Sequence, residues 1–151
     1  MLGEAELPWV GRTTGPEQTE TLGAELATRL VAGDIVLVRG ELGAGKTCLV
    51  RGAARALGVS DPVTSPTFSI GHRYHADGVV VSHLDLYRLP ALAEEDPALL
   101  ADYLGAGRIA FVEWPPAPAW QLADARWAVT LHHAGGDVRE VEVHQIGGEQ
   151  R

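Results

Sequence analysis

The chain has one cysteine and one lysine, and its basic residues are few and scattered. Cys48 alone can form neither an internal disulfide nor a zinc site built from several cysteines, and this fits a reducing cytosol. No stretch approaches the roughly 18 to 20 apolar residues that a membrane-spanning helix needs. The formal net charge is −8, and no three basic residues are consecutive. Because direct binding of nucleic acid usually needs a basic face, we expect any such contact to come through a partner protein.

The length and composition predict a single domain over residues 1–151, with residues 1–8 and 147–151 flexible. Thr14 and Glu17 have the spacing of a capping box, and Pro16 suits a first helical position. Helical or alternating spacing of apolar residues predicts the other elements. The expected helices are 16–32, 46–57 and 91–104, and the expected strands are 35–38, 68–74, 79–84, 109–112, 126–131 and 138–144.

The only lysine stands in a phosphate-binding motif. Residues 40–47, GELGAGKT, match G-x-x-x-x-G-K-[ST] in full, between a predicted strand and a predicted helix. The glycines let the backbone curl so that its N–H groups point at an anion, and the helix adds its positive end. Lys46 can reach between the β and γ phosphates as a compact charge, and Thr47 offers a hydroxyl to Mg²⁺. The alternative is a glycine-rich turn that precedes a helix by chance.

Two acidic residues follow predicted buried strands, where ligands gather in α/β sheets. Glu113 ends the run Phe111-Val-Glu113 and suits a metal ion, directly or through water. Asp85 follows the strand 79–84 and suits the positioning or activation of an attacking water. Either acid could instead be an ordinary solvated carboxylate. With one lysine, the chain cannot carry the N-K-x-D motif of guanine-specific proteins, so adenine is the expected base.

Three further features have two interpretations each. The segment 64–67, TSPT, is either a switch that senses the γ-phosphate through hydroxyls or an ordinary turn. Trp114 either covers the nucleotide or caps the edge of the core. The pair His132 and His133 is interpreted as a solvated hairpin end rather than as metal ligands.

Four motifs in fixed order, GELGAGKT, TSPTF, HLDLYRL and VEWP, resemble the bacterial TsaE (YjeE) family. The resemblance covers roughly residues 10–131. It implies a P-loop NTPase fold of the α/β class, with a mostly parallel central sheet flanked by helices and with antiparallel hairpin strands. Cys48 departs from the family, whose members usually have a second hydroxyl residue there, so packing is its alternative role.

The resemblance also implies an activity and partners. Members of the family are cytoplasmic ATPases that bind ATP and Mg²⁺ and serve the synthesis of N6-threonylcarbamoyladenosine at position 37 of tRNA, in a complex with the TsaD and TsaB proteins. The tRNA would then be met only through that complex. The expected catalytic residues are Asp85 and Lys46, and the expected metal ligands are Thr47 and Glu113. The expected nucleotide contacts are Glu41, Leu42, Gly43, Ala44, Gly45, Lys46, Thr47, Cys48 and Trp114, with Ser65 and Thr67 in the switch-like segment and adenine contacts somewhere in Thr14 to Thr19.

Two other functions fit the same loop. A small-molecule kinase would use it with an arginine-rich lid, but residues 85–108 hold only Arg88 and Arg108. A binding module gated by nucleotide would not depend on hydrolysis at all.

Overall fold

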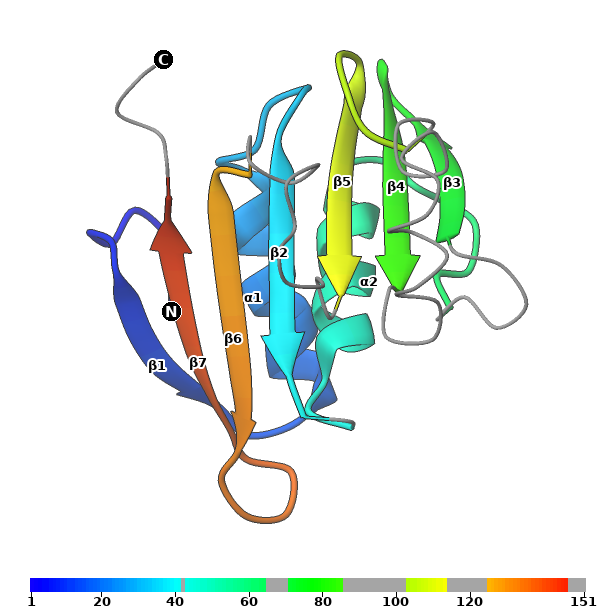
Figure 1. Cartoon of the computed structure of the whole chain (residues 1–151). Coiled ribbons are helices and arrows are strands. Elements are labelled where there is room, and N and C mark those ends of the chain that lie inside the picture. The colour runs from blue at the N-terminus through cyan, green and yellow to red at the C-terminus, as the bar shows by residue number, and fades with distance from the viewer. Residues whose placement is uncertain (42, 65–70, 86–102, 114–124, 147–151) are drawn as a thin grey trace, which may run out of the picture.

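The computed structural model describes residues 1–41, 43–64, 71–85, 103–113 and 125–146. The described residues form one seven-stranded sheet and two helices (Figure 1). The helices are α1 (Pro16–Ala27) and α2 (Lys46–Ala56). The strands are β1 (Trp9–Thr13), β2 (Ile35–Gly40), β3 (Gly71–Ala76), β4 (Val79–Asp85), β5 (Arg108–Glu113), β6 (Trp127–His133) and β7 (Arg139–Gln145).

The sheet has the strand order β1-β7-β6-β2-β5-β4-β3. The four central strands β6, β2, β5 and β4 run parallel, whereas the pairings β6–β7, β7–β1 and β4–β3 are antiparallel. The prediction of a mostly parallel sheet was therefore wrong. The physical reason is that two tight hairpins reverse the chain at β3–β4 and β6–β7, and that the unpredicted β1 adds an antiparallel edge.

Both described helices lie on the same face of the sheet, behind it in Figure 1. The two helices approach each other closely at Gly52, where an added Cβ would lie 1.9 Å from the carbonyl oxygen of Glu20. The predicted helix 91–104 and the segment before β3 fall largely outside the described residues. The predicted flanking of the sheet by helices is therefore seen on one face only, within the described part of the chain.

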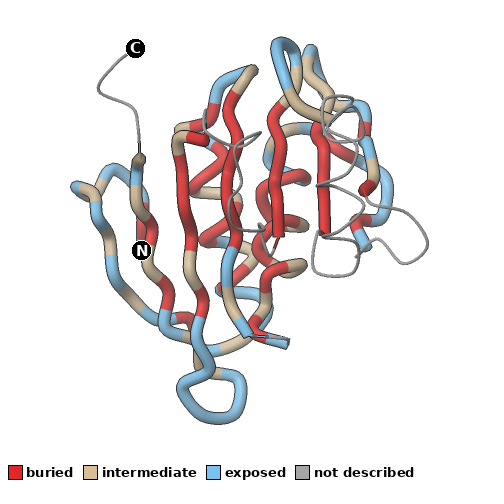
Figure 2. The backbone as a smooth tube through the Cα atoms, in the orientation of Figure 1, coloured by how far each residue is buried: buried red, intermediate tan, exposed pale blue. Residues whose placement is uncertain are grey.

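The core has one part on each face of the sheet, as the two-residue period of buried strands requires. Val36, Val38, Phe111 and Val129 belong to the part that contacts the helices. The alternate residues belong to a second cluster on the opposite face: Ile35, Leu37, Leu84, Ala110, Val112, Ala125 and Ala128. Buried residues run continuously along the central strands, and exposure rises toward β1 and the β6–β7 turn (Figure 2).

The start of α1 differs from the sequence prediction. Gly15 is the N-cap and no side chain caps the helix, so the predicted capping box is wrong. Thr14 instead donates its main-chain N–H to Oε1 of Gln18, at 2.8 Å. The helix also ends earlier than predicted, at Ala27, although Leu30 in the turn that follows is still buried.

The segment before β1 is joined to α1. Leu2 is buried, and its N–H donates to Oε1 of Glu25 at 2.6 Å. Arg29 donates to the carbonyl oxygens of Gly3 and Ala5. None of the helices in the described part of the chain has the length and apolar character needed to span a membrane.

Candidate functional site

The loop between β2 and α2 has the shape of an anion-binding turn. Gly45 is the N-cap of α2 with φ of 100°, a left-handed conformation that glycine adopts without strain. No side chain caps this helix, so the N–H groups of its first turn remain available to a ligand. Their positive partial charge favours an anion such as phosphate.

Lys46, the first residue of α2, is only 5% exposed. Its Nζ donates to the carbonyl oxygens of Gly40, at 2.8 Å, and Glu41, at 3.1 Å. Burial lowers the pKa of Lys46 below its usual 10.5, whereas the negative charges of Glu113 and Asp85 act in the opposite direction. The ammonium is therefore held inside the loop, within electrostatic range of both acids.

Asp85 and Glu113 are neighbours at the ends of two parallel strands. They are register partners as the last residues of β4 and β5, and both are buried, at 8% and 3% exposed. Both strand ends point toward the edge of the sheet at which α2 begins (Figure 1). Phe111 packs on the helix side of the sheet, and the two-residue period puts Glu113 on that same side. The structure places the two strand-end acids next to each other and within electrostatic range of Lys46, and their roles stay a prediction.

A residue without a predicted role completes this cluster. His83 lies two residues before Asp85 in β4 and is fully buried. Its Nε2 is hydrogen bonded to Oε2 of Glu113. The spacing of two residues from Asp85 could have indicated that both side chains lie on the same face of the strand.

A cavity of about 220 Å³ adjoins the loop on the side of α1. Its lining includes the start of α1, the loop, the first turn of α2 and the end of the β6–β7 hairpin. These residues are Gly15, Pro16, Thr19, Gly43, Gly45, Cys48, Asp137 and Arg139. Three residues in the predicted range of adenine contacts, Thr14 to Thr19, therefore border a cavity next to the loop, and adenine contact stays a prediction.

The β6–β7 hairpin contributes a contact that the sequence did not predict. Arg139 donates through Nη2 to the carbonyl oxygen of Gly43, at 3.3 Å, and through Nη1 to Gly136 and Val138. Gly43 and Arg139 are 96 residues apart, and no short motif connects them. The parallel pairing of β6 with β2, in which Leu131 lies opposite Gly40, brings the end of the hairpin to the loop.

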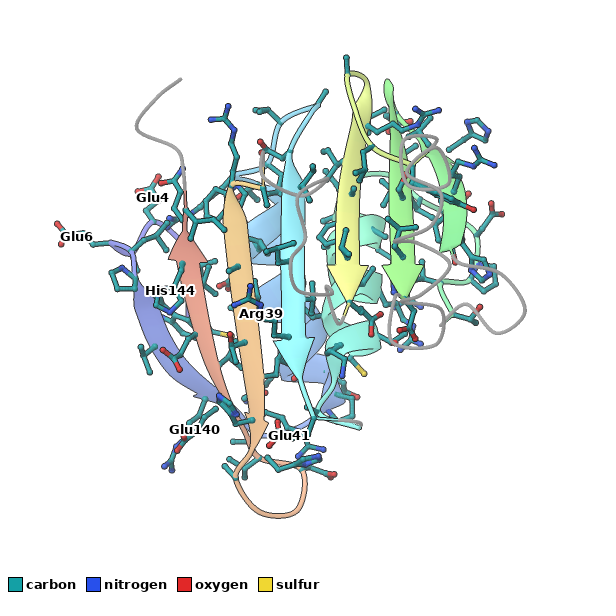
Figure 3. All side chains as sticks on the ribbon, in the orientation of Figure 1. Glu4, Glu6, Arg39, Glu41, Glu140 and His144 are labelled. Carbon is teal, nitrogen blue, oxygen red and sulfur yellow. The ribbon has the colours of Figure 1, made fainter. Side chains whose placement is uncertain are left out.

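The outer side of the loop is exposed and polar. Glu41 is half exposed and forms an ion pair with His132, at 3.6 Å. Hydrogen bonding to its own backbone N–H lowers the pKa of Glu41, and His132 and His133 add to the effect. Figure 3 shows Glu41 at the end of β2, and Arg39 on the face of the sheet that points away from the helices. The interpretation of the two histidines as an exposed hairpin end agrees with this geometry.

The predicted contacts Leu42 and Trp114, and the switch-like residues Ser65 and Thr67, lie outside the described residues. The chain leading to the switch-like segment is fixed to α2, because Arg51 donates through Nε and Nη2 to the carbonyl oxygen of Val63, both at 3.2 Å. Val63 therefore lies next to α2, the helix that follows the loop.

The residues present suit a magnesium ion that is held mainly by phosphate and water. No group of three or more His, Cys, Asp or Glu side chains forms a ready metal site among the described residues. Mg²⁺ in nucleotide sites needs fewer protein ligands, because it keeps several waters and takes one or two carboxylates together with phosphate oxygens. Two adjacent carboxyl side chains at the strand ends supply oxygen atoms of the kind that Mg²⁺ prefers. Thr47 in the first turn of α2 adds a hydroxyl.

Known proteins resemble the chain over most of its length. The family model described as threonylcarbamoyl adenosine biosynthesis protein TsaE matches residues 13–141. A protein named tRNA threonylcarbamoyladenosine biosynthesis protein TsaE from Bacillus subtilis is 35% identical over 143 residues, which are 94% of this chain and 87% of that protein. A protein of the same name from Streptomyces coelicolor is 41% identical over 132 residues, which are 83% and 89% of the two chains.

A solved structure agrees with the sequence relatives. The crystal structure of Bacillus subtilis YdiB matches with a TM-score of 0.74 and 29% identity, covering 96% of this chain and 91% of that chain. The family match includes the loop, both strand-end acids and the first three residues of β7. The chain therefore belongs to the TsaE family of tRNA threonylcarbamoyladenosine biosynthesis proteins.

Proposed function

We propose that this chain is the accessory ATPase of tRNA N6-threonylcarbamoyladenosine synthesis. It binds ATP with Mg²⁺ and hydrolyses it in a complex with the TsaD and TsaB proteins, in the cytoplasm. The observation that carries the proposal is the position of Lys46. A buried ammonium stands between the carbonyl oxygens of a phosphate-loop motif and two carboxylates at neighbouring strand ends. A buried charged cluster of this kind adds little to the stability of the fold. It would provide opposite charges on two sides of a bound triphosphate.

In this proposal the loop residues bind and orient the phosphates. The main-chain N–H groups from Gly43 to Thr47 surround the phosphate oxygens, and Lys46 turns from the loop carbonyls toward the β and γ phosphates. The nucleoside occupies the cavity between α1 and the β6–β7 hairpin, where Gly15, Pro16 and Thr19 form one wall.

The two acids have separate roles. Thr47 and Glu113 would hold Mg²⁺, which would supply positive charge to the phosphate oxygens. Asp85 would orient the attacking water and accept its proton. The water oxygen bonds to the γ-phosphorus as the bond from that phosphorus to the β,γ-bridging oxygen breaks, so ADP leaves with that oxygen and inorganic phosphate is released. The nearness of Lys46 to both carboxylates supports this division, because the same ammonium responds to both charges.

The acidic composition supports indirect contact with tRNA. A net charge of −8 disfavours phosphate backbones, so tRNA is met through TsaD and TsaB rather than through this chain. In this proposal the chain hydrolyses ATP for the complex and does not itself transfer the threonylcarbamoyl group.

The proposal is tested by ATP hydrolysis with purified TsaD and TsaB. Asp85→Asn is expected to lower turnover by about a hundredfold or more, the usual size of a lost general base, while nucleotide affinity changes little. Asp77→Asn is the matched control, because Asp77 is an exposed aspartate in the turn at the other end of β4. Turnover equal to that of the unmodified chain in Asp85→Asn would refute the catalytic role.

A small-molecule kinase and a nucleotide-gated binding module remain the alternatives. The kinase predicts a phosphorylated small molecule as product from the isolated chain, whereas the proposed ATPase releases phosphate and needs its partners. The module predicts that cells keep their threonylcarbamoyladenosine when Asp85→Asn replaces the natural chain. Measuring the modified nucleoside in tRNA from such cells separates the module from the ATPase.

A further inference from the structure

We propose that His83 is a positioning residue that fixes the carboxylate of Glu113 for Mg²⁺. This inference rests on the function proposed above. Glu113 lies at the end of β5, where the side chain can rotate about its own bonds, and an acid that holds a metal loses affinity when its oxygens are not held in place. His83 supplies the fixed partner from the neighbouring strand.

The contact between the two side chains has a defined direction. His83 is fully buried, Glu113 is 3% exposed, and Nε2 of the ring meets Oε2 of the carboxylate. When Glu113 is ionised, as a metal ligand must be, its oxygens only accept, so Nε2–H of His83 donates. This bond engages Oε2 rather than Oε1. The free oxygen is the one that can face a metal or a metal-bound water.

Within the described structure, the ring of His83 makes no hydrogen bond other than the one to Glu113. Its Nδ1 is buried and has no hydrogen-bond partner among the described residues. Burying a polar ring for a single bond costs free energy that an apolar residue of similar shape would not. A role for this bond in the site accounts for a histidine at a buried position of β4, two residues after Val81 on the face that packs against the helices.

The register explains why the histidine and not another residue acts on Glu113. His83 and Asp85 alternate to the same face of β4, and β5 runs parallel beside them with Glu113 opposite Asp85. The carboxylate thus has His83 toward the core, Asp85 at its side and the Lys46 ammonium within electrostatic range. His83 is the only one of the three whose side chain is fully enclosed, so it is the fixed point of the cluster.

The test separates metal binding from nucleotide binding. A fluorescent ADP analogue is titrated into the full chain in EDTA, and Mg²⁺ is then titrated into the nucleotide complex. His83→Phe keeps the ring shape without a donor. His83→Gln keeps a donor, because the amide nitrogen of glutamine can occupy the place of Nε2. Glu113→Gln and the double variant with His83→Phe complete a double-mutant cycle.

His83→Phe is expected to weaken the apparent Mg²⁺ affinity by about 10- to 100-fold, with affinity in EDTA changed by no more than about twofold. His83→Gln should recover most of the loss. The double variant should bind Mg²⁺ no more weakly than Glu113→Gln alone, because the histidine acts through that carboxylate.

Four results would overturn this inference and leave the proposed function standing. They are an unchanged Mg²⁺ affinity in His83→Phe, an equal loss of nucleotide affinity in EDTA, no recovery of Mg²⁺ affinity in His83→Gln, and additive losses in the double variant. A failure of the proposed function looks different, because the unmodified chain itself would then bind no nucleotide, or would bind it without any response to Mg²⁺. That result would remove the inference together with the function.

Discussion

Replacing Lys46 by methionine is expected to abolish useful nucleotide binding while the fold persists. Methionine keeps the length of the buried stem and removes the ammonium that faces the phosphates. In the structure this ammonium donates to loop carbonyls and lies within electrostatic range of carboxylates, and its loss removes no apolar packing. The effect on affinity should therefore far exceed the effect on stability.

The magnitude follows from the charges. Two unit charges about 4 Å apart interact by about 4 kcal/mol at the effective dielectric constant of a partly buried site. Some of this is offset, because Lys46 must give up its hydrogen bonds to Gly40 and Glu41 when it turns to the phosphates. A net loss of about 3 kcal/mol, or about a hundredfold in Kd, is expected. The cost to folding is about 1 kcal/mol, because removing a desolvated charge partly compensates the lost bonds.

The assay is a titration of a fluorescent ADP analogue together with a thermal melt. Arg39→Met is the matched control, because it removes one positive charge from the same part of the chain on the opposite face of the sheet (Figure 3). The control should bind nucleotide as the unmodified chain does. An affinity of Lys46→Met within about threefold of the unmodified chain would refute the reasoning, since it would mean that no phosphate lies against this side chain.

Three further predictions concern the same region. Nucleotide affinity should fall as the pH rises through the alkaline range below 10.5. Burial lowers the pKa of Lys46 in the free protein and bound phosphate raises it, so nucleotide binding takes up a proton in this range. Titrations of nucleotide at several pH values should show no such fall for Lys46→Met, and the absence of a fall in the unmodified chain would contradict the assignment. Cys48 borders the cavity next to the loop, so ATP should slow its reaction with N-ethylmaleimide several-fold, as followed by mass spectrometry, and equal rates with and without ATP would place the nucleotide elsewhere. Gly52→Ala should destabilise the chain by about 1–3 kcal/mol, because the added Cβ would lie 1.9 Å from the carbonyl oxygen of Glu20. Gly15→Ala, whose Cβ would meet nothing within 4 Å, should show a much smaller loss in the same melting experiment.

The local elements could be predicted from the sequence because their signals are local. The phosphate-loop motif gave the boundary between β2 and α2, and apolar runs gave β4 and β5 to within a residue or two. The edge strand β1 could not be predicted, since residues 9–13 are short and contain Gly11, and only pairing with β7 makes them a strand. This pairing adds a third antiparallel pair to the β3–β4 and β6–β7 hairpins, so the sheet is not mostly parallel as predicted.

The sequence likewise predicts some residues of the candidate site and misses others. Asp85 and Glu113 were predicted because each follows a buried strand, and parallel strands bring their ends together. The contact of Arg139 with Gly43 depends on the order of strands in the sheet, which no short pattern encodes. The bond between His83 and Glu113 depends on the register of β4 and β5, which the residues alone do not determine.

The central claim is that residues 40–47 bind the phosphates of ATP. A crystal structure of the chain grown with Mg²⁺ and a non-hydrolysable ATP analogue tests it most directly. The account predicts phosphate oxygens within hydrogen-bond distance of Nζ of Lys46 and of the main-chain N–H groups at the start of α2, with the base in the cavity beside Thr19. An analogue bound elsewhere, with the loop carbonyls still holding Lys46, would contradict it.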